Sequence, residues 1–340
     1  MKAVIVESAY TVVVKNVSKP VIGEHEVLIK VKTAGICGSD IHTYKGIHPF
    51  RKPPVVIGHE VSGEVVEVGS RTSKVKVGDH VTVEPQYGCG KCEPCFTGRI
   101  HYCANRSAPG IGNWYGTMAE YFAAPEECVF VVPKTMDYQL SVLAEPLAVG
   151  VHAVRKADLR VGERVAILGA GPIGLLTLSA AKAAGATVLM ATDVLDYALE
   201  HAVKLGATHT LNIRGRDNWA IDAKKIAGGE FDKVFVAAGA PGIINQALSL
   251  LRKGGRAVAV AMFHGEQPLD VIQLQGMEKE LIGSFTYMRE DTRTAIDLLL
   301  AGSIPFESIV SHVLPYSEAD KGFRLVDKKE DQSMKVLITF

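Results

Sequence analysis

Four of the six cysteines in this 340-residue chain stand close together, at Cys89, Cys92, Cys95 and Cys103. Short spacings let a loop turn such thiolates to one side, where a tetrahedral Zn²⁺ can bind them. Protein would fill all four positions around the metal, so we expect a closed, structural zinc site. An iron–sulfur cluster uses similar ligands and is the alternative. Disulfides are a weaker explanation, because the opening MKAVIVESAY lacks the long apolar segment of a secretory signal.

A second set of metal-binding residue types is dispersed along the chain: Cys37 in GICGSD, His59 and Glu60 in GHE, and Glu145 in LAEP. Taken singly, each has a structural explanation. Cys37 can be a core thiol, His59 a hydrogen-bonded turn histidine, and Glu145 a charge at the start of a helix. A Zn²⁺ with three protein ligands would instead keep one position open for water or an alcohol. The residues alone leave both interpretations open.

A glycine turn in VAILGAGPIG could bind a dinucleotide. An apolar run suited to a buried strand precedes it, and a run of small residues suited to a helix follows it. Gly169 would allow the tight turn, Gly171 would let a pyrophosphate approach, and Gly174 would let the helix pack closely on the strand. Asp193 ends the next apolar run, about 20 residues further on, where an acid binds the ribose hydroxyls. A 2′-phosphate would meet this carboxylate, so we predict NAD rather than NADP.

The composition is that of a globular protein, with 47% hydrophobic and 22% charged residues. At 340 residues the chain is long enough for two domains. Acidic and basic residues number 37 each, so no net field favours nucleic acid or an anionic membrane surface. Residues 165–181 are too few for a membrane span, which needs about 20 apolar residues, and a Gly-Pro pair interrupts them. We therefore expect a cytoplasmic protein that binds neither nucleic acid nor membrane.

The pattern of expected secondary structure divides the chain into two regions. Up to about residue 147, short β-branched runs separated by Gly, Pro and Asp predict a mostly β region. From Val161 onwards, strands and helices alternate, which predicts a parallel sheet. The expected strands are 2–6, 27–33, 61–68, 80–84 and 128–132, then 165–168, 187–191, 233–237, 256–260 and 280–284, and finally 335–340. The expected helices include 241–251, closed by Gly254 and Gly255, together with 291–301 and 317–326. Cys128 is expected to be a buried core thiol.

Five motifs together resemble the zinc-dependent medium-chain dehydrogenases over essentially the full chain: GICGSDIH (35–42), GHE (58–60), the four-cysteine lobe, AEPLAVGVHA (144–153) and GAGPIG (169–174). The similar branch is that of sorbitol, butanediol and threonine dehydrogenases. The resemblance implies an α/β fold with a GroES-like β-rich catalytic domain at 1–147 and 286–340, whose structural zinc lobe is 88–104. It also implies a Rossmann domain with a doubly wound parallel sheet at 148–285, and a homotetramer or homodimer.

The same resemblance implies a catalytic zinc held by Cys37, His59 and Glu145, with Glu60 as an occasional ligand or a neighbour of the ligands. The zinc would lower the pKa of the substrate hydroxyl, and NAD would take the hydride. Ser39 and His42 match the proton-relay positions, although His42 can also be a surface or ribose-contacting histidine. The residues expected to bind the cofactor are Gly169, Gly171, Pro172, Ile173, Gly174, Asp193, Ala238 and Gly239.

The expected substrate is a polyol, vicinal diol or sugar-derived alcohol, because simple-alcohol members usually have a cysteine where Glu145 stands. Trp114 and Tyr115 depart from the family's pattern and could alter the wall of the substrate pocket. Arg51 leaves open an acidic sugar substrate, although a solvated surface arginine is the simpler interpretation. Two alternatives remain: a threonine-type amino-alcohol dehydrogenase, and a redox sensor that binds nucleotide and zinc without dehydrogenase activity.

Overall fold

The N-terminal part of the chain forms antiparallel sheets in the computed structural model, which describes residues 1–340. β3 lies at the centre of the larger sheet, where it pairs with β5, β7 and the C-terminal β16. The strand order of this sheet is β15-β16-β3-β5-β6-β8, and β2-β1-β4 form a second sheet. The strands are β1 (Lys2–Ser8), β2 (Thr11–Asn16), β3 (Glu26–Ile36), β4 (Val55–Val56), β5 (Glu60–Val68), β6 (His80–Val83), β7 (Tyr121–Pro125), β8 (Val129–Val131), β15 (Val310–Pro315) and β16 (Lys335–Thr339).

The last strand therefore returns to the first half of the chain, although it lies about 300 residues from β3 in sequence. In β16, Ile338 pairs with Ala34 of β3, and both are fully buried. The helix before this strand, α11 (Ala319–Lys328), buries Phe323, whose ring lies 5.6 Å from that of Tyr44. The other helices of this part are α1 (Gly38–Tyr44), α2 (Glu93–Phe96), α3 (Tyr138–Ser141) and α10 (Arg289–Leu300).

The chain folds as two units. The first contains Met1–Glu145, Met288–Leu300 and Val310–Phe340, and the second contains Pro146–Tyr287 and Ala301–Ile309. The β-rich first unit has a core in which Cys128 is buried, as expected from the sequence, among the valines of β3, β5 and β6. None of the helices in the chain combines the length and the apolar composition that crossing a bilayer requires.

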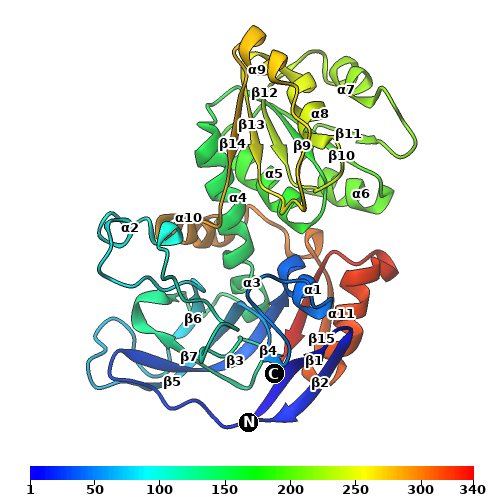
Figure 1. Ribbon diagram of the computed structural model, residues 1–340. Helices are drawn as coiled ribbons and strands as arrows, with labels where there is room; N and C mark the ends of the chain where they lie inside the picture. Colours follow the sequence, from blue (N-terminus) through cyan, green and yellow to red (C-terminus); the bar gives the residue numbers. More distant parts are fainter. The chain divides into compact units, whose positions relative to one another are not determined.

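The second unit is a six-stranded parallel sheet with helices on both faces (Figure 1). Its order, β11-β10-β9-β12-β13-β14, is that of the doubly wound dinucleotide-binding fold. The strands are β9 (Arg164–Leu168), β10 (Val188–Asp193), β11 (His209–Asn212), β12 (Phe231–Val236), β13 (Leu251–Ala259) and β14 (Glu280–Gly283). The helices are α4 (Ala144–Ala157), which begins at the end of the first unit, α5 (Pro172–Ala183), α6 (Asp196–Lys204), α7 (Trp219–Ala227), α8 (Ile243–Leu250) and α9 (Val271–Met277).

The expected end of the helix at 241–251 is wrong in one respect. α8 ends at Leu250 and β13 begins at the next residue, so Gly254 and Gly255 lie inside the strand rather than between helix and strand. The pairing of β12 with β13 shifts register between Phe231 and Lys233, and Gly254 has a φ of +68°. Gly254 therefore lies where the strand is irregular and its backbone needs a positive φ, which glycine adopts readily.

Candidate active site

Cys37, His59 and Glu60 come together in the first unit. Cys37 follows β3 and directly precedes α1, while His59 and Glu60 lie at the start of β5, which pairs with β3. The pairing places Glu60 opposite Gly35, two residues before Cys37. One ligand atom from each of Cys37, His59 and Glu60 lies within 4.8 Å of the other two. A thiol, an imidazole and a carboxylate at this separation can bind one zinc ion.

The surroundings of the Glu60 carboxylate show that Cys37, His59 and Glu60 together suit a cation. Oε1 of Glu60 forms a buried ion pair with the ammonium of Lys335, and Lys335 also donates to the carbonyl of Ile36 at 3.1 Å. Its Oε2 is buried and has no hydrogen-bond partner. A β-carbon on Gly35 would lie 1.8 Å from Oε2, so only glycine leaves room for this oxygen. A buried, unsatisfied carboxylate oxygen is costly unless it binds a donor or a metal.

Glu145 lies outside that group of three but close to it. It is buried at 6% exposure in the first turn of α4. Burial alone would lower the pKa of Lys335, but the charges of Glu60, Cys37 and also Glu145 raise it. The structure therefore brings Glu145 into the same charged neighbourhood.

Asp40 fixes the orientation of His59. Asp40 is fully buried in α1, and its Oδ1 lies 3.2 Å from Nδ1 of His59. Its Oδ2 accepts a hydrogen bond from the backbone N–H of Cys37 at 3.0 Å. Burial alone would lower the pKa of His59, but Asp40 and Cys37 raise it well above its usual value. A carboxylate on Nδ1 leaves Nε2 for a metal, which is the usual way a histidine ligand is held.

Ser39 and His42 both lie in α1, three residues apart, and both are half-buried. Residues at this spacing share one face of a helix. Beside Ser39 lies Arg51, which is only 8% exposed, so the interpretation of Arg51 as a solvated surface arginine is wrong. Its guanidinium is held by the carbonyl of Pro109 and by the groups around His59, which replace its contacts with water.

The four cysteines of the lobe also come together. One sulfur atom from each lies within 4.8 Å of the other three, and the sulfurs of Cys92 and Cys95 are 3.4 Å apart. Tetrahedral Zn²⁺ with Zn–S bonds of about 2.3 Å places its sulfurs about 3.8 Å apart, so only small shifts would close the site. The backbone N–H of Cys89 donates to the sulfur of Cys103. This bond, together with one from the backbone of Asn105 and those with the neighbouring thiols, lowers the pKa of that thiol to about 6. None of the cysteines forms a disulfide.

The glycine turn lies between β9 and α5. A β-carbon on Gly174 would lie 1.8 Å from the carbonyl oxygen of Gly169, so the helix packs on the turn only with glycine there. A β-carbon on Gly171 would meet nothing within 4 Å, which leaves this backbone open to a ligand. Gly171 caps the helix, and Pro172 and Ile173 begin it. The N-terminus of a twelve-residue helix beside open backbone suits a pyrophosphate.

The other predicted cofactor residues lie at the same edge of the sheet. β9, β10 and β12 are parallel neighbours, so their carboxyl ends meet. Asp193 ends β10, and its Oδ2 accepts the N–H of Ala170 at 2.7 Å. The β-carbon of Ala238 would lie 2.8 Å from one placed on Gly169, and Gly239 follows it. This edge is where doubly wound sheets bind nucleotides.

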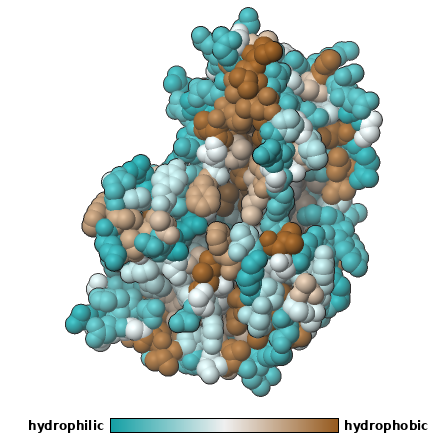
Figure 2. Space-filling view, in the orientation of Figure 1, coloured by the Kyte–Doolittle hydropathy of each residue, from teal (hydrophilic) through white to brown (hydrophobic).

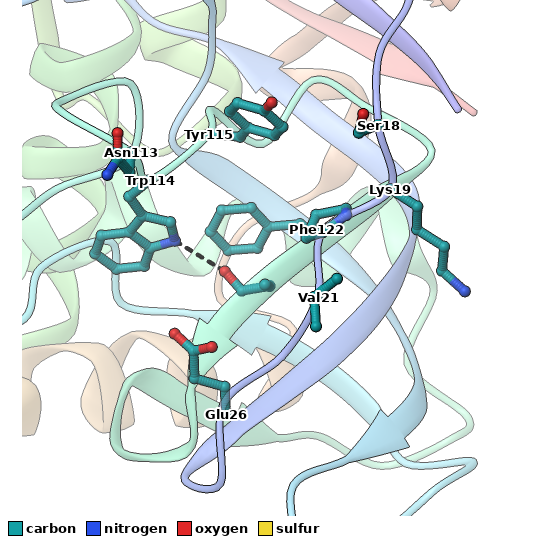
Figure 3. Close-up of a pocket in the computed structure, with 10 residues that line it drawn as sticks. Ser18, Lys19, Val21, Glu26, Asn113, Trp114, Tyr115 and Phe122 are labelled. Carbon is teal, nitrogen blue, oxygen red and sulfur yellow. Dashed lines mark hydrogen bonds between the residues drawn. The ribbon is translucent and has the colours of Figure 1, made fainter.

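Trp114 and Tyr115 lie apart from the metal-binding residue types. They line a cavity of about 470 Å³ in the first unit (Figure 3). Trp114 stacks on Phe122 with an interplanar angle of 13° and donates Nε1–H to the carbonyl of Ala123 at 2.8 Å. The remaining lining residues are Ser18, Lys19, Pro20, Val21, Glu26 and Asn113. None of the candidate zinc ligands lines this cavity, and Trp114 packs on Phe122 of β7.

Three residues of the site were not singled out from the sequence: Asp40, Lys335 and Gly35. Asp40 had a local signal, because it stands three residues after Cys37, where a side chain can reach back to the start of the helix. Lys335 had none, since it reaches Glu60 only because β16 pairs with β3.

The sequence and fold define a class of enzyme. Residues 23–134 match the family described as "Alcohol dehydrogenase GroES-like domain", and residues 172–301 match "Zinc-binding dehydrogenase". Sorbitol dehydrogenase of Bacillus subtilis is 33% identical, covering 99% of this chain and 97% of its own length. D-arabitol-phosphate dehydrogenase of Enterococcus avium is 39% identical, covering 95% and 92%. A zinc-binding dehydrogenase of Sinorhizobium meliloti 1021, solved bound to NADP, has a TM-score of 0.92 at 33% identity, covering 100% and 99%.

The chain therefore belongs to the zinc-dependent medium-chain dehydrogenases, in the branch that contains the polyol dehydrogenases. The predicted fold class and enzyme class are confirmed. Zinc and a nicotinamide cofactor belong to this class.

Proposed function

We propose that this enzyme oxidises a secondary hydroxyl of a polyol, vicinal diol or sugar-derived alcohol and transfers the hydride to NAD. The observation that carries the proposal is the group of half-buried Cys37 and buried His59 and Glu60, with one carboxylate oxygen unsatisfied. The relatives named for sorbitol and D-arabitol phosphate support this class of substrate. In this proposal each chain binds two zinc ions, one catalytic and one structural.

In this proposal a catalytic zinc would be held by Cys37, His59 and a carboxylate. Glu60 is the better placed of the two candidates, because its oxygen is within 4.8 Å of the other ligand atoms. Glu145 lies outside this group, and its charge acts on Lys335, the ion-pair partner of Glu60. A carboxylate in place of a second thiolate gives a harder centre, which favours oxygen ligands and leaves room for two vicinal hydroxyls.

When bound, zinc supplies a Lewis acid that lowers the pKa of the reacting hydroxyl, and the nicotinamide supplies a hydride acceptor. The side chains of α1 move the proton. Ser39 accepts it from the substrate hydroxyl, and His42 passes it outward. Asp40 holds His59 with Nε2 facing the ligands. Asp193 would accept hydrogen bonds from the ribose hydroxyls of the cofactor, which supports NAD over NADP.

A kinetic panel tests this function. Reduced nicotinamide is measured with sorbitol, 2,3-butanediol, a sugar acid, a polyol phosphate, threonine, ethanol and propanol. We expect a compound with vicinal hydroxyls to exceed the simple alcohols in kcat/KM by at least about tenfold, which needs only about 1.4 kcal/mol of differential transition-state binding. Threonine as the best substrate would favour the amino-alcohol alternative, and no turnover of any compound would favour the sensor.

The variant His59→Ala separates catalysis from cofactor binding. It should abolish turnover and leave NADH binding unchanged, because the cofactor is bound by the second unit. His25→Ala, at an exposed position of the first unit, is the control and should keep full activity. Retained activity of His59→Ala after treatment with a chelator would contradict the metal-dependent mechanism. The cytoplasmic location and the homo-oligomer stay predictions.

A further inference from the structure

We propose that Arg51 is a positioning residue for proton transfer, which aims the hydroxyl of Ser39 and acts through it. The proposal rests on the dehydrogenase function proposed above. Its basis is that a buried guanidinium contacts the hydroxyl that would accept the proton, and that the same guanidinium faces the carboxylate that orients His59.

The side chain of Arg51 is fixed along its length. Its Nε–H donates to the carbonyl of Pro109 at 3.0 Å. Its aliphatic part crosses Gly110, where an added β-carbon would lie 3.3 Å from Cδ. The backbone is held as well, because Nδ1 of His48 accepts the N–H groups of Phe50 at 3.2 Å and of Arg51 at 2.9 Å. A guanidinium with so little freedom can orient its neighbours.

The hydroxyl of Ser39 is the neighbour that this cation controls. Nη1 of Arg51 donates to Oγ of Ser39 at 3.4 Å. A serine hydroxyl has one donor and two lone pairs, so this contact occupies one lone pair and turns the O–H away from Arg51. The second lone pair remains for the proton of the substrate. Arginine stays protonated in proteins, so the proton cannot leave through Arg51 and must leave through another acceptor, for which His42 is the candidate.

The same guanidinium also faces Asp40, the carboxylate that orients His59. Nη1 lies 3.6 Å from Oδ1 of Asp40 and 3.5 Å from Nδ1 of His59. Asp40 is fully buried, and a buried carboxylate needs more than one donor. Arg51 therefore links the serine of the proton path to the carboxylate behind His59. A lysine would keep the positive charge, but its single ammonium could not reach both Pro109 and Ser39.

A double-mutant cycle tests the proposal, with Arg51→Met, Ser39→Ala and the combination of both. We expect Arg51→Met alone to lower kcat by about tenfold to a hundredfold with an unchanged KM for NAD, since general acid–base catalysis contributes about a hundredfold or more. In the Ser39→Ala background, the same change should lower kcat by less than about threefold, because residues that act as a unit are not additive. Arg51→Lys should keep an intermediate rate.

Zinc content, NADH binding and melting temperature are measured for every variant. We expect Arg51→Met to keep its zinc content and NADH binding, and to melt at a lower temperature because the buried carboxylate of Asp40 loses one of its charged partners. Arg71→Met is the matched control: Arg71 pairs with Glu24 on the surface of the first unit, and its side chain is 66% exposed. It should change no readout.

Equal losses of kcat in the presence and absence of Ser39 would overturn the proposal, as would loss of zinc from both Arg51→Met and Arg51→Lys. Absence of turnover in the wild-type enzyme would instead contradict the proposed function, and would be seen before any variant is made.

Discussion

At the scale of single residues, backbone N–H groups hold the carboxylate of Asp193 in place. Its Oδ2 accepts the N–H of Ala170, and its Oδ1 accepts the N–H groups of Val194 at 2.7 Å and Leu195 at 3.0 Å. Three donors keep the carboxylate at the end of β10. Arg214 lies beside it, because its Nε donates to the carbonyl of Val194 at 3.0 Å. A negative and a positive side chain thus stand at the edge where the ribose would bind.

We predict that Asp193→Ser shifts the cofactor preference towards NADP. Removing the carboxylate removes its repulsion of a 2′-phosphate, and Arg214 already supplies a positive charge nearby. The ratio of kcat/KM for NADP to that for NAD should rise by at least about tenfold, or about 1.4 kcal/mol. Asp196→Ser, whose carboxylate accepts from Asn212, is the control and should leave the ratio unchanged. A wild-type enzyme that already prefers NADP would contradict the assignment.

We predict that His48 makes the enzyme sensitive to acid. Burial and, next, the charge of Arg51 lower the pKa of His48 from its usual 6.5 to about 4. The unfolded chain therefore binds more protons than the folded chain between these values, so stability rises with pH across this window. Lowering the pH from 6.5 to 4 should therefore decrease the free energy of unfolding by about 1–3 kcal/mol through this residue alone.

The measurement is the free energy of unfolding at several pH values for the wild type and for His48→Asn, which can keep an acceptor in place but does not titrate. The difference between the two proteins removes the contribution of all groups that they share. We expect the loss between pH 6.5 and pH 4 to be smaller in His48→Asn. Parallel curves would show that His48 does not titrate in this window.

The sequence located Asp193 by a local signal, and its role in binding the ribose stays a prediction. Asp193 follows the glycine turn at a fixed spacing, and the structure places it beside Ala170 of that turn. Arg51 was misread because nothing in its own neighbourhood in sequence indicates that Pro109 and Ser39 surround it. Burial of a charged side chain depends on contacts between segments that are distant in the chain.

At the scale of elements, the four-cysteine lobe has few contacts besides its cysteines that could stabilise its fold. Its short helix, α2, has no buried residue, and Phe96 at its end is 75% exposed. A lobe without an apolar core needs another source of stability, and a structural zinc supplies folding free energy directly.

We therefore predict that Cys95→Ser lowers the zinc content by about one ion per chain and lowers the melting temperature, since structural zinc contributes to folding. Metal content is measured by elemental analysis after gel filtration. Cys128→Ala is the control, because Cys128 lies in the core of the first unit, with its thiol against the carbonyl of Gln86. It should keep the full zinc content. Unchanged zinc in Cys95→Ser, or iron and sulfide in the wild type, would show that the lobe is not a zinc site.

The sequence predicted elements well where their pattern is periodic. The expected strand at 280–284 corresponds to β14 (Glu280–Gly283), and the expected helix at 291–301 to α10 (Arg289–Leu300). It did not predict β7 (Tyr121–Pro125) or β15 (Val310–Pro315). These short strands are defined by their partners, β3 and β16, rather than by a pattern of their own.

At the scale of the whole molecule, the parallel sheet of the second unit has an open edge. The order ends at β14, so one side of this strand has no neighbour in the chain. Apolar side chains gather over the adjacent α9 on the face shown in Figure 2. Val271 is 61% exposed and Ile272 is 80% exposed. An exposed apolar patch beside an open strand edge is typical of an interface between protein chains.

We predict that two copies of this chain associate through β14 and α9. In a two-fold symmetric dimer each residue of the patch is buried twice, and burying one isoleucine side chain contributes about 1.5–3 kcal/mol. Ile272→Asp should therefore raise the dissociation constant by at least about a hundredfold, or about 3 kcal/mol. Mass measurement by light scattering after gel filtration should give a dimer or a multiple of it for the wild type and smaller species for the variant.

Ile221→Asp is the matched control, since Ile221 is 64% exposed on α7, and it should leave the mass unchanged. A wild-type monomer at micromolar concentration, or an equal effect of both substitutions, would show that this edge is not the interface. Because the edge belongs to the second unit and the candidate zinc ligands to the first, a monomeric Ile272→Asp that keeps its full zinc content would also show that metal binding does not depend on association.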